Sequence, residues 1–416
     1  MIQLGLARIS RLLENTPIPW KAIHVAGTNG KGSVCAYASA MLHASGVKTG
    51  RFTSPYLIDR WDCITIQERA VSPTLFHAME SKVKAHDQRH EIGATEFEIL
   101  TATAFEIFYQ FSVEVGVVEV GLGGTHDATN ILPNPAVTII TKIGLDHQSY
   151  LGDTIELIAG QKAGVIKSCT ICLADGTNEP SVLEILRTCV QIQRARSLRF
   201  ITSDTQVPQS ELEKSLSRMQ FASHQLINIR LALAAAHEVL SILGHKVSQS
   251  VLLEAIKRTS WPGRLQFVNL EDIVCFERDI LLDGAHNLDA AKVLGSFVDH
   301  RVRQDASPVL WLIGMSRGKD AGEILRSMLR SGDLVMATAF HEVEGMPWIK
   351  AMEPQMIVES ALSVCSLQEA VTSSQSIEHT LHAAAKLANR RPIVIAGSLY
   401  LVSEVLSLKR RVLGTT

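Results

Sequence analysis

Apolar runs and helical stretches alternate along the first half of the chain. Segments with apolar residues at three- and four-residue steps, such as 33–45 and 98–111, predict helices. Between such segments lie short runs rich in β-branched residues, which predict strands: AIHVAG, VKTGRFTS, VGVVEVG, AVTIITKIG and TICLAD. Strands separated by helices indicate right-handed βαβ units and a mostly parallel sheet.

The pattern changes after this first series. The stretch 192–220 is polar and weakly periodic, which predicts a connector with one short helix, and 224–243 predicts a long helix. Proline and glycine in SWPGRLQ (260–266) predict a hinge near Pro262–Gly263. Beyond the hinge the alternation restarts with four runs that predict strands: DIVCFERDILLDGAHN, PVLWLIGMS, DLVMATAF and PIVIAGSLY.

Composition narrows the function classes. Of the 416 residues, 46% are hydrophobic and 20% charged, with a net charge of −2, so no broad attraction to nucleic acid or an anionic membrane is expected. No apolar run approaches the ~18–20 residues of a membrane span. Arg8, Arg11 and Glu14 interrupt the first apolar positions, which indicates an amphipathic helix rather than a signal peptide. We expect a cytoplasmic protein, with a mitochondrial location as the weaker alternative.

The cysteines also favour a reducing compartment, because the seven are scattered along the chain. One C-x-x-C pair, Cys169 and Cys172, falls in a run that predicts a strand. Because no second pair exists to complete a zinc site, we expect two buried structural thiols.

The sequence GTNGKGS follows a predicted strand and opens a predicted helix, which is the setting of a phosphate-binding loop. Glycines let backbone N–H groups approach phosphate oxygens, Lys31 can reach the outer phosphates, and the Ser33 hydroxyl can bind Mg²⁺. The glycine spacing is shorter than in the common phosphate-loop pattern, so a plain glycine turn and a dinucleotide site remain alternatives. A nucleoside triphosphate is favoured, bound by the whole loop: Gly27, Thr28, Asn29, Gly30, Lys31, Gly32 and Ser33.

Other polar residues end the neighbouring predicted strands. Glu119 lies inside an apolar run, where an unpaired carboxylate would cost several kcal/mol, so it is expected to bind a metal. A helix cap or a pair with an arginine is the alternative. Asp146 and His147 follow the next strand, and Ser54 ends a third. Because parallel strands end at one edge of a sheet, these residues are expected to meet near the phosphate loop.

These features belong to a longer series of motifs that spans essentially the whole chain. In order, they are HVAGTNGKGS, FTSP, EVGLGG with DATN, GLDH, KAGVIK, HQ with a following Asn, PGR, DGAHN and GKD. The series resembles the folylpolyglutamate synthase/dihydrofolate synthase family of the Mur ligase superfamily. The stretches LIDRWDCI and VEGMPWI are most similar to stand-alone fungal-type dihydrofolate synthases.

The resemblance implies a fold and a domain division. We expect an α/β protein with a P-loop-type, mostly parallel sheet and flanking helices, plus a smaller C-terminal α/β domain that is Rossmann-like. Residues 1–262 would form the ATP-binding central domain, and residues 263–416 the C-terminal glutamate-ligase domain.

The resemblance also implies roles for individual residues. Lys31, Glu119, His147 and Lys162 would be catalytic, and Lys162 is commonly carbamylated in this family. Two Mg²⁺ ions would be held by Ser33, Ser54, Glu119, His147 and Lys162, while a monovalent cation is left open. Further ATP contacts from the hinge and second domain would come from Asn228, Arg264, Asp283 and His286. The pterin pocket would be lined by Thr95, Phe97, Asp127 and Ala128.

The implied reaction joins L-glutamate to 7,8-dihydropteroate at the expense of ATP, through an acyl phosphate. The partners would be small molecules only, dihydropteroate or folate and L-glutamate, and family members are typically monomers. Some positions depart from the family: Thr125 and His126 stand where an arginine is usual, Tyr56 where histidine is frequent, and Gln67-Glu68 where Asn-Gly is common.

These departures leave other readings open. One is a folylpolyglutamate synthase that adds glutamates to reduced folates, and another is a paralogue that ligates a different carboxylic acid. A catalytically silent ATP-binding protein is a third, but the retention of Lys31, Glu119, His147 and Lys162 argues against it.

Overall fold

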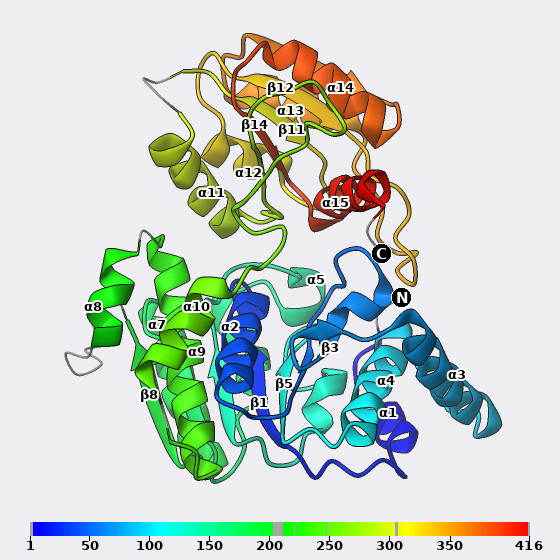
Figure 1. Cartoon of the computed structure of the whole chain (residues 1–416), viewed down its shortest axis with the longest axis vertical. Coiled ribbons are helices and arrows are strands. Elements are labelled where there is room, and N and C mark those ends of the chain that lie inside the picture. Colours follow the sequence, from blue (N-terminus) through cyan, green and yellow to red (C-terminus); the bar gives the residue numbers. More distant parts are fainter. Residues whose placement is uncertain (1–2, 203–210, 220, 247, 304–306, 415–416) are drawn as a thin grey trace. The chain divides into compact units, whose positions relative to one another are not determined.

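The computed structural model describes residues 3–202, 211–219, 221–246, 248–303 and 307–414. The chain divides into two compact units, Met1–Ser260 and Trp261–Thr416. Each unit contains its own mostly parallel sheet with flanking helices (Figure 1), so the predicted fold class is confirmed. Within the described ranges, no helix has the length and apolar character needed to cross a membrane.

The sheet of the first unit has eight strands in the described part of the chain, in the order β4-β3-β2-β5-β1-β6-β7-β8. Six neighbouring strands run parallel to one another: β2, β5, β1, β6, β7 and β8. At the β2 edge, β3 and β4 add to the sheet in antiparallel orientation. Their bounds are β1 Lys21–Ala26, β2 Thr49–Phe52, β3 Ile64–Ile66, β4 Arg69–Ala70, β5 Val115–Glu119, β6 Val137–Ile140, β7 Ile171–Asp175 and β8 Ser197–Ile201.

Helices cover this sheet on both faces, which explains why its central strands are apolar runs rather than alternating patterns. β1 is buried at every position after Lys21, and α2 packs against α9 over one face of the sheet. The α-helices are α1 Ala7–Leu12, α2 Lys31–Ala44, α3 Pro73–Arg89, α4 Glu96–Gln110, α5 Gln148–Leu151, α6 Ile155–Ala163, α7 Pro180–Gln193, α8 Glu211–Arg218, α9 Ser223–Ile242 and α10 Gln249–Arg258. Two short 3₁₀ helices are η1 Arg60–Cys63 and η2 Ala128–Ile131.

The strand order makes β1 the switch point of the sheet. β5 lies on one side of β1 and β6 on the other, so the chain crosses from one half of the sheet to the other between these two strands. In open α/β sheets, the loops at the carboxyl ends of strands diverge at such a crossing and leave room for a ligand. The loops after β1, β2, β5 and β6 all begin at this edge of the sheet.

The structure corrects the prediction for 192–220, which was a connector with one short helix. α7 extends to Gln193, and β8 then adds a strand to the sheet before α8; residues 203–210 and 220 lie outside the described residues. β8 is the last strand of the order, and four of its five residues are at least partly exposed. An edge strand of this kind carries charged residues such as Arg199 and shows no apolar run.

The cysteine prediction is half right. Cys172 is buried in β7, and burial raises the pKa of its thiol to about 12. Cys169 is exposed and has a positive φ of 60°, because it lies in the turn before the strand. Neither cysteine belongs to a group of three or more potential metal ligands among the described residues.

The turn between β3 and β4 uses two residues in the left-handed region, Gln67 (φ 53°) and Glu68 (φ 62°). Asparagine and glycine favour this conformation, whereas other residues pay about 1 kcal/mol or more each. Both side chains make contacts that offset the strain. The Gln67 side-chain oxygen lies 2.8 Å from Nδ1 of His43 in α2, within hydrogen-bond distance. The Glu68 carboxylate accepts from the Ser39 hydroxyl of α2 and pairs with the Arg51 guanidinium at 2.7 Å.

The second unit has a six-stranded sheet, within the residues described, in the order β13-β12-β11-β14-β10-β9, parallel except for β9. The strands are β9 Gln266–Val268, β10 Ile280–Leu282, β11 Leu310–Ile313, β12 Leu334–Thr338, β13 Glu369–Ser373 and β14 Ile393–Ala396. The helices are α11 Leu288–Arg301, α12 Ala321–Met328, α13 Pro354–Val364, α14 Ile377–Ala388 and α15 Leu399–Leu413.

Two sequence predictions differ from the structure in this unit. The run 272–287 predicted one strand, but only β10 is regular, because its first half is broken by exposed charged residues. The edge strands β9 and β13 were not predicted, since β9 has only three residues and no residue of β13 is buried. A buried carboxylate, Asp333, fixes the start of β12. It accepts from the Arg303 guanidinium, the Trp311 indole and two backbone N–H groups, those of Val309 and Arg330.

Candidate active site

The phosphate loop, residues 27–33, lies at the carboxyl end of β1 and leads directly into α2. Gly27 and Gly30 both have positive φ, 151° and 93°. A Cβ at Gly27 would lie 1.8 Å from the Thr141 hydroxyl oxygen, and one at Gly30 would lie 2.5 Å from the Asn228 side-chain oxygen. Only glycine fits at these two positions, so the loop packs tightly against the segment after β6 and against α9.

Asn228 therefore contacts the phosphate loop from within the first unit. It is buried in α9, and the prediction that it comes from the hinge or second domain is wrong. The helix that carries Asn228 precedes the hinge in sequence, and it packs on α2 within the first unit.

Backbone bonds hold the loop in place. The N–H groups of Thr28 and Asn29 donate to the Lys142 carbonyl at 2.8 and 3.1 Å. α2 begins at Lys31 without a side-chain cap, so the first N–H groups of the helix have no partner within the helix. Such a helix start attracts anions through its N–H groups and its dipole.

Lys31 and Glu119 face each other across the end of β1 and β5. The Lys31 ammonium lies 3.9 Å from a Glu119 carboxylate oxygen and donates to the Thr28 carbonyl at 3.2 Å. Glu119 is only 4% exposed, and its second carboxylate oxygen accepts from the Ser54 N–H at 3.1 Å. The structure thus brings Lys31, Glu119 and Ser54 together. Ser33 follows Lys31 in the first turn of α2.

Lys162 is the second lysine at this edge. It is 5% exposed in α6, and its ammonium group donates to the Gly27 carbonyl at 2.7 Å. Burial lowers the pKa of Lys162 to about 7, and the charge of Lys31 acts in the same direction, while Asp146 and Asp127 oppose the shift. A sizeable fraction of Lys162 is therefore uncharged near neutral pH.

The glycine-rich loop after β5 packs on the backbone around Lys162. A Cβ at Gly124 would lie 2.6 Å from the Lys162 carbonyl oxygen. Thr125 donates from both its N–H and its hydroxyl to the Gln161 carbonyl, at 2.9 and 3.1 Å. A Cβ at Gly164 would in turn lie 2.6 Å from the Thr125 Cα. Thr125, which stands where the family usually has arginine, thus holds the end of α6 that carries Lys162.

This packing predicts opposite outcomes for two glycines of the same segment. Gly164→Ala should destabilise the protein by about 1–3 kcal/mol, because the new methyl group meets Thr125 backbone. Gly160→Ala should be neutral or stabilising, by up to about 1 kcal/mol, because nothing lies within 4 Å of a Cβ at this helical position. Urea unfolding of both variants checks the difference, and equal stabilities would contradict this account of the loop.

His147 follows Asp146 in the loop after β6 and is the first residue before α5. Its φ of 52° places it in the left-handed region, which is strained for histidine. Its ring is 47% exposed, with Nε2 3.9 Å from an Asp146 carboxylate oxygen. The charge of Asp146 partly opposes the lowering of the Lys162 pKa. Asp146 therefore lies close to Lys162, and the loop after β6 approaches α6.

The four predicted pterin residues come from two segments that the structure brings together. Thr95 and Phe97 lie at the start of α4, and Asp127 and Ala128 at the start of η2, which packs on α4. The Phe97 ring covers Gly121, where a Cβ would lie 2.4 Å from it. Thr95 also caps α4 in a capping box with Glu98, a local structural role that the T-x-x-E spacing predicts.

Asp127 is fixed inside its own loop. Its carboxylate accepts from the Leu122 N–H at 2.8 Å, the Thr129 N–H at 3.0 Å and the Thr129 hydroxyl at 2.5 Å. The carboxyl group is 1% exposed, and burial raises its pKa. These bonds stabilise the conformation of the loop after β5.

His24, which sequence reasoning passed over as part of an apolar run, extends this chain of bonds. It is fully buried in β1, with Nε2 2.8 Å from the Thr129 hydroxyl oxygen. Because that hydroxyl donates its proton to Asp127, it must accept from His24, which requires the Nε2–H tautomer. His24 Nδ1, which then carries no hydrogen, has no hydrogen-bond partner in the described part of the chain. A single polar residue within a buried strand was the signal available in the sequence.

His24 predicts a specific pH dependence of stability. Burial lowers its pKa from 6.5 to about 3, and the charge of Lys167 acts in the same direction. Between these values the unfolded chain binds a proton that the folded protein does not. The stability contributed by neutral His24 is therefore complete above about pH 6.5 and is lost as the pH falls, by about 2 kcal/mol at pH 5.

The measurement is the free energy of unfolding at pH 7 and pH 5. His24→Gln, which can still donate to Thr129, should lose less stability over this range than the wild type. The exposed His382 provides the control, and His382→Gln should keep the wild-type slope. His224, whose pKa burial lowers to about 4, is present in all three proteins and cancels. Identical slopes for the wild type and His24→Gln would contradict the assignment.

The remaining predicted ATP residues lie in the second unit, at the carboxyl end of β10. Asp283 is buried, accepts from the N–H groups of Leu265 and Ala285 at 2.7 and 2.8 Å, and has its pKa raised by burial. Arg264 lies over Gly284, where a Cβ would be 2.4 Å from its guanidinium. His286 Nδ1 lies 2.8 Å from the Gly284 carbonyl. The structure brings Arg264, Asp283 and His286 together as one group.

The donors in the first unit suit a divalent cation of the Mg²⁺ type. Such ions prefer oxygen ligands, which Glu119, Ser33 and Ser54 supply. The Glu119 carboxylate is nearly buried, and its negative charge faces Lys31 at a distance too long for a hydrogen bond. Lys162 is a cation or a neutral amine and does not fit as an oxygen ligand unless it is carbamylated.

Comparisons with known proteins match the whole chain. The family model described as dihydrofolate synthetase, C-terminal domain, matches residues 266–408. A "Probable dihydrofolate synthetase" of Schizosaccharomyces pombe is 37% identical over 419 residues, which cover 97% of this chain and 98% of the relative.

Solved structures of similar proteins have the same fold. One, a folylpolyglutamate synthase/dihydrofolate synthase of Yersinia pestis complexed with AMPPNP and Mn ion, aligns with a TM-score of 0.81 at 26% identity and covers 98% of this chain and 94% of its own. E. coli FolC in complex with DHPP and ADP aligns with a TM-score of 0.80 at 26% identity, over 99% of this chain and 94% of its own.

Proposed function

The chain belongs to the folylpolyglutamate synthase/dihydrofolate synthase family, and on this premise we propose that it is a dihydrofolate synthase. It joins the amino group of L-glutamate to the carboxylate of 7,8-dihydropteroate and converts ATP to ADP and phosphate. The relative from S. pombe and the matching family model are both named for dihydrofolate synthetase, which favours this activity over polyglutamylation.

The observation that carries the proposal is the group formed by Lys31, Glu119 and Lys162 at one edge of the sheet. Two lysines lie near one another, with one nearly buried carboxylate and the uncapped start of α2. The Lys31 ammonium and the backbone N–H groups at the start of α2 offer partners for phosphate oxygens, which suits a polyphosphate.

The chemistry needs ATP because a carboxylate is a poor electrophile. The pteroate carboxylate attacks the γ-phosphorus and forms an acyl phosphate, with ADP as the leaving group. The glutamate nitrogen then attacks the acyl carbon, phosphate leaves, and the nitrogen loses a proton to give the amide. Lys31 stabilises the charge on the transferring phosphoryl group, and the loop holds ATP in line with the acceptor.

Divalent ions bound by Ser33, Ser54 and Glu119, and by His147 with Lys162, would neutralise further phosphate charge. We propose Mg²⁺ for this role. Structures of similar proteins contain AMPPNP with Mn ion, which supports a nucleotide together with a divalent metal. The residues of the phosphate loop and the group Arg264, Asp283 and His286 would bind the nucleotide, and Thr95, Phe97, Asp127 and Ala128 the pterin.

The first prediction here concerns the substrate. The purified protein should release ADP when given ATP, Mg²⁺, L-glutamate and 7,8-dihydropteroate, and the product should be dihydrofolate. Lys31→Ala should lower turnover by about 10²-fold or more, because the phosphoryl charge loses its partner. Lys21, exposed at the opposite end of β1, supplies the control, and Lys21→Ala should retain activity.

Tetrahydrofolate serves as the competing acceptor in the same assay. ADP release with tetrahydrofolate but not with dihydropteroate would replace the proposal by folylpolyglutamate synthase activity. Turnover with neither acceptor would reject both.

A second prediction concerns the state of Lys162. Its buried, partly uncharged amine can attack CO₂ to form a carbamate with loss of a proton, which turns a cation into an anionic oxygen ligand. Electron density in a crystal grown with bicarbonate should continue beyond the Lys162 nitrogen. Density that ends at the nitrogen, in crystals of active protein with nucleotide and Mg²⁺, would contradict the carbamate.

We further propose that the first unit binds ATP and that the second acts as the glutamate-ligase domain. A monomeric, cytoplasmic enzyme is the expected form, because its substrates are small molecules and its scattered thiols suit a reducing compartment.

A further inference from the structure

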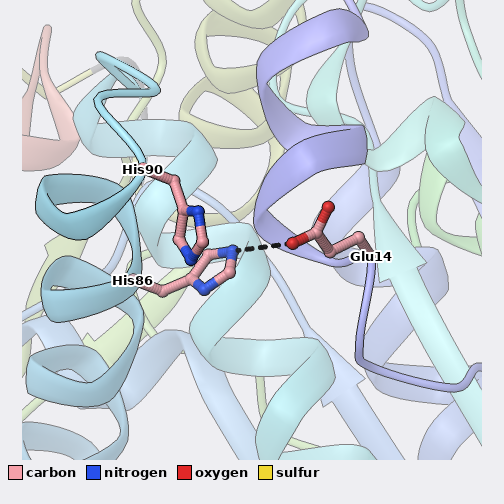
Figure 2. A group of neighbouring side chains, drawn as sticks. All are labelled: Glu14, His86 and His90. Atoms are coloured by element: carbon pink, nitrogen blue, oxygen red, sulfur yellow. Dashed lines mark ion pairs between the residues drawn. The ribbon is translucent and has the colours of Figure 1, made fainter.

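A second cluster of potential metal ligands lies among residues that have no part in the proposed reaction. Glu14 follows α1, His86 lies in the last turn of α3, and His90 ends that helix. One ligand atom from each of the three lies within 4.8 Å of the others. Figure 2 shows the three side chains turned toward one another from two separate segments.

The histidines have the spacing of a helical chelate. His86 and His90 are four residues apart, so they lie one above the other on the same face of the helix. Their ring centroids are 4.4 Å apart. Pairs of histidines at this spacing on a helix bind zinc in enzymes that carry the H-x-x-x-H pattern.

The distance to Glu14 also fits a shared ion. His86 Nε2 and a Glu14 carboxylate oxygen are 3.7 Å apart (Figure 2), which is too long for a hydrogen bond. Two ligands that are each ~2.0–2.1 Å from a tetrahedral zinc ion are separated by roughly 3.4 Å. A small rotation of the exposed Glu14 side chain closes this difference.

We propose that Glu14, His86 and His90 form a binding site for Zn²⁺ or a similar transition-metal ion, with water completing the coordination. Two imidazoles and one carboxylate favour such ions over Mg²⁺, which prefers oxygen ligands. The site is separate from the residues assigned to the magnesium-dependent reaction.

Existing contacts both support and oppose metal binding. Arg11 donates to the His90 carbonyl at 2.7 Å and so holds the last turn of α1 against the end of α3. The Arg11 carbonyl also lies 3.1 Å from His86 Nε2. To bind metal through Nε2, His86 must give up this bond and carry its proton on Nδ1, which lowers the affinity relative to a preformed structural site.

The bound ion would join two segments more than 70 residues apart in sequence, Glu14 and the end of α3. It would thereby stabilise the packing of α1 on α3 without taking part in the proposed amide-forming reaction. The inference does not depend on the proposed activity.

The test is calorimetric titration of the purified full-length protein with ZnCl₂ in excess MgCl₂, which keeps the oxygen-ligand site occupied. One Zn²⁺ per chain should bind, and the thermal unfolding temperature should rise with zinc. His86→Ala, His90→Ala and Glu14→Gln should each weaken binding by about tenfold or more. His382→Ala, which removes an exposed histidine of α14, should bind zinc like the wild type.

Ligase activity with Mg²⁺ separates this inference from the proposed function, because the three cluster variants should retain wild-type turnover. Cobalt in place of zinc should give a visible absorption band that is absent from His86→Ala. Failure of one Zn²⁺ to bind, or equal binding by the wild type and the double variant His86→Ala/His90→Ala, would overturn the proposal.

Discussion

The hydrogen bond from the Lys162 ammonium to the Gly27 carbonyl joins helix α6 to the phosphate loop, and the site in the first unit depends on it. A buried amine is costly unless it is bonded, and here it also lies near Lys31. The loop after β5 supports this arrangement, since Gly124 and Thr125 pack on the backbone next to Lys162. The bonds that position Lys162 against the phosphate loop are therefore in place before any ligand arrives.

Much of this edge could be predicted from the sequence. Lys31, Glu119 and His147 each follow a buried apolar run, and parallel strands place the residues after such runs at one edge. The partners of these residues could not be predicted in the same way. Asn228 reaches the phosphate loop only because α9 packs on α2, and His24 meets Thr129 across more than 100 residues of sequence.

Two of the missed strands have a common cause. β8 and β13 lie at the edges of their sheets and are partly exposed, so neither carries the continuous apolar run that identified the central strands. Thr95 is a different case, because its capping role was readable from the T-x-x-E spacing, whereas a contact to a ligand was not. A local sequence motif thus predicts local structure, such as a helix cap, better than it predicts which residues contact a ligand.

The turn at Gln67 and Glu68 limits what can be learned by comparing single positions among relatives. Replacing these residues with the Asn-Gly common in the family would relieve backbone strain, which is the usual rationale for consensus engineering. The same exchange would remove the groups that bind His43, Ser39 and Arg51. The strained turn and its partners on α2 and β2 would therefore need to be exchanged together.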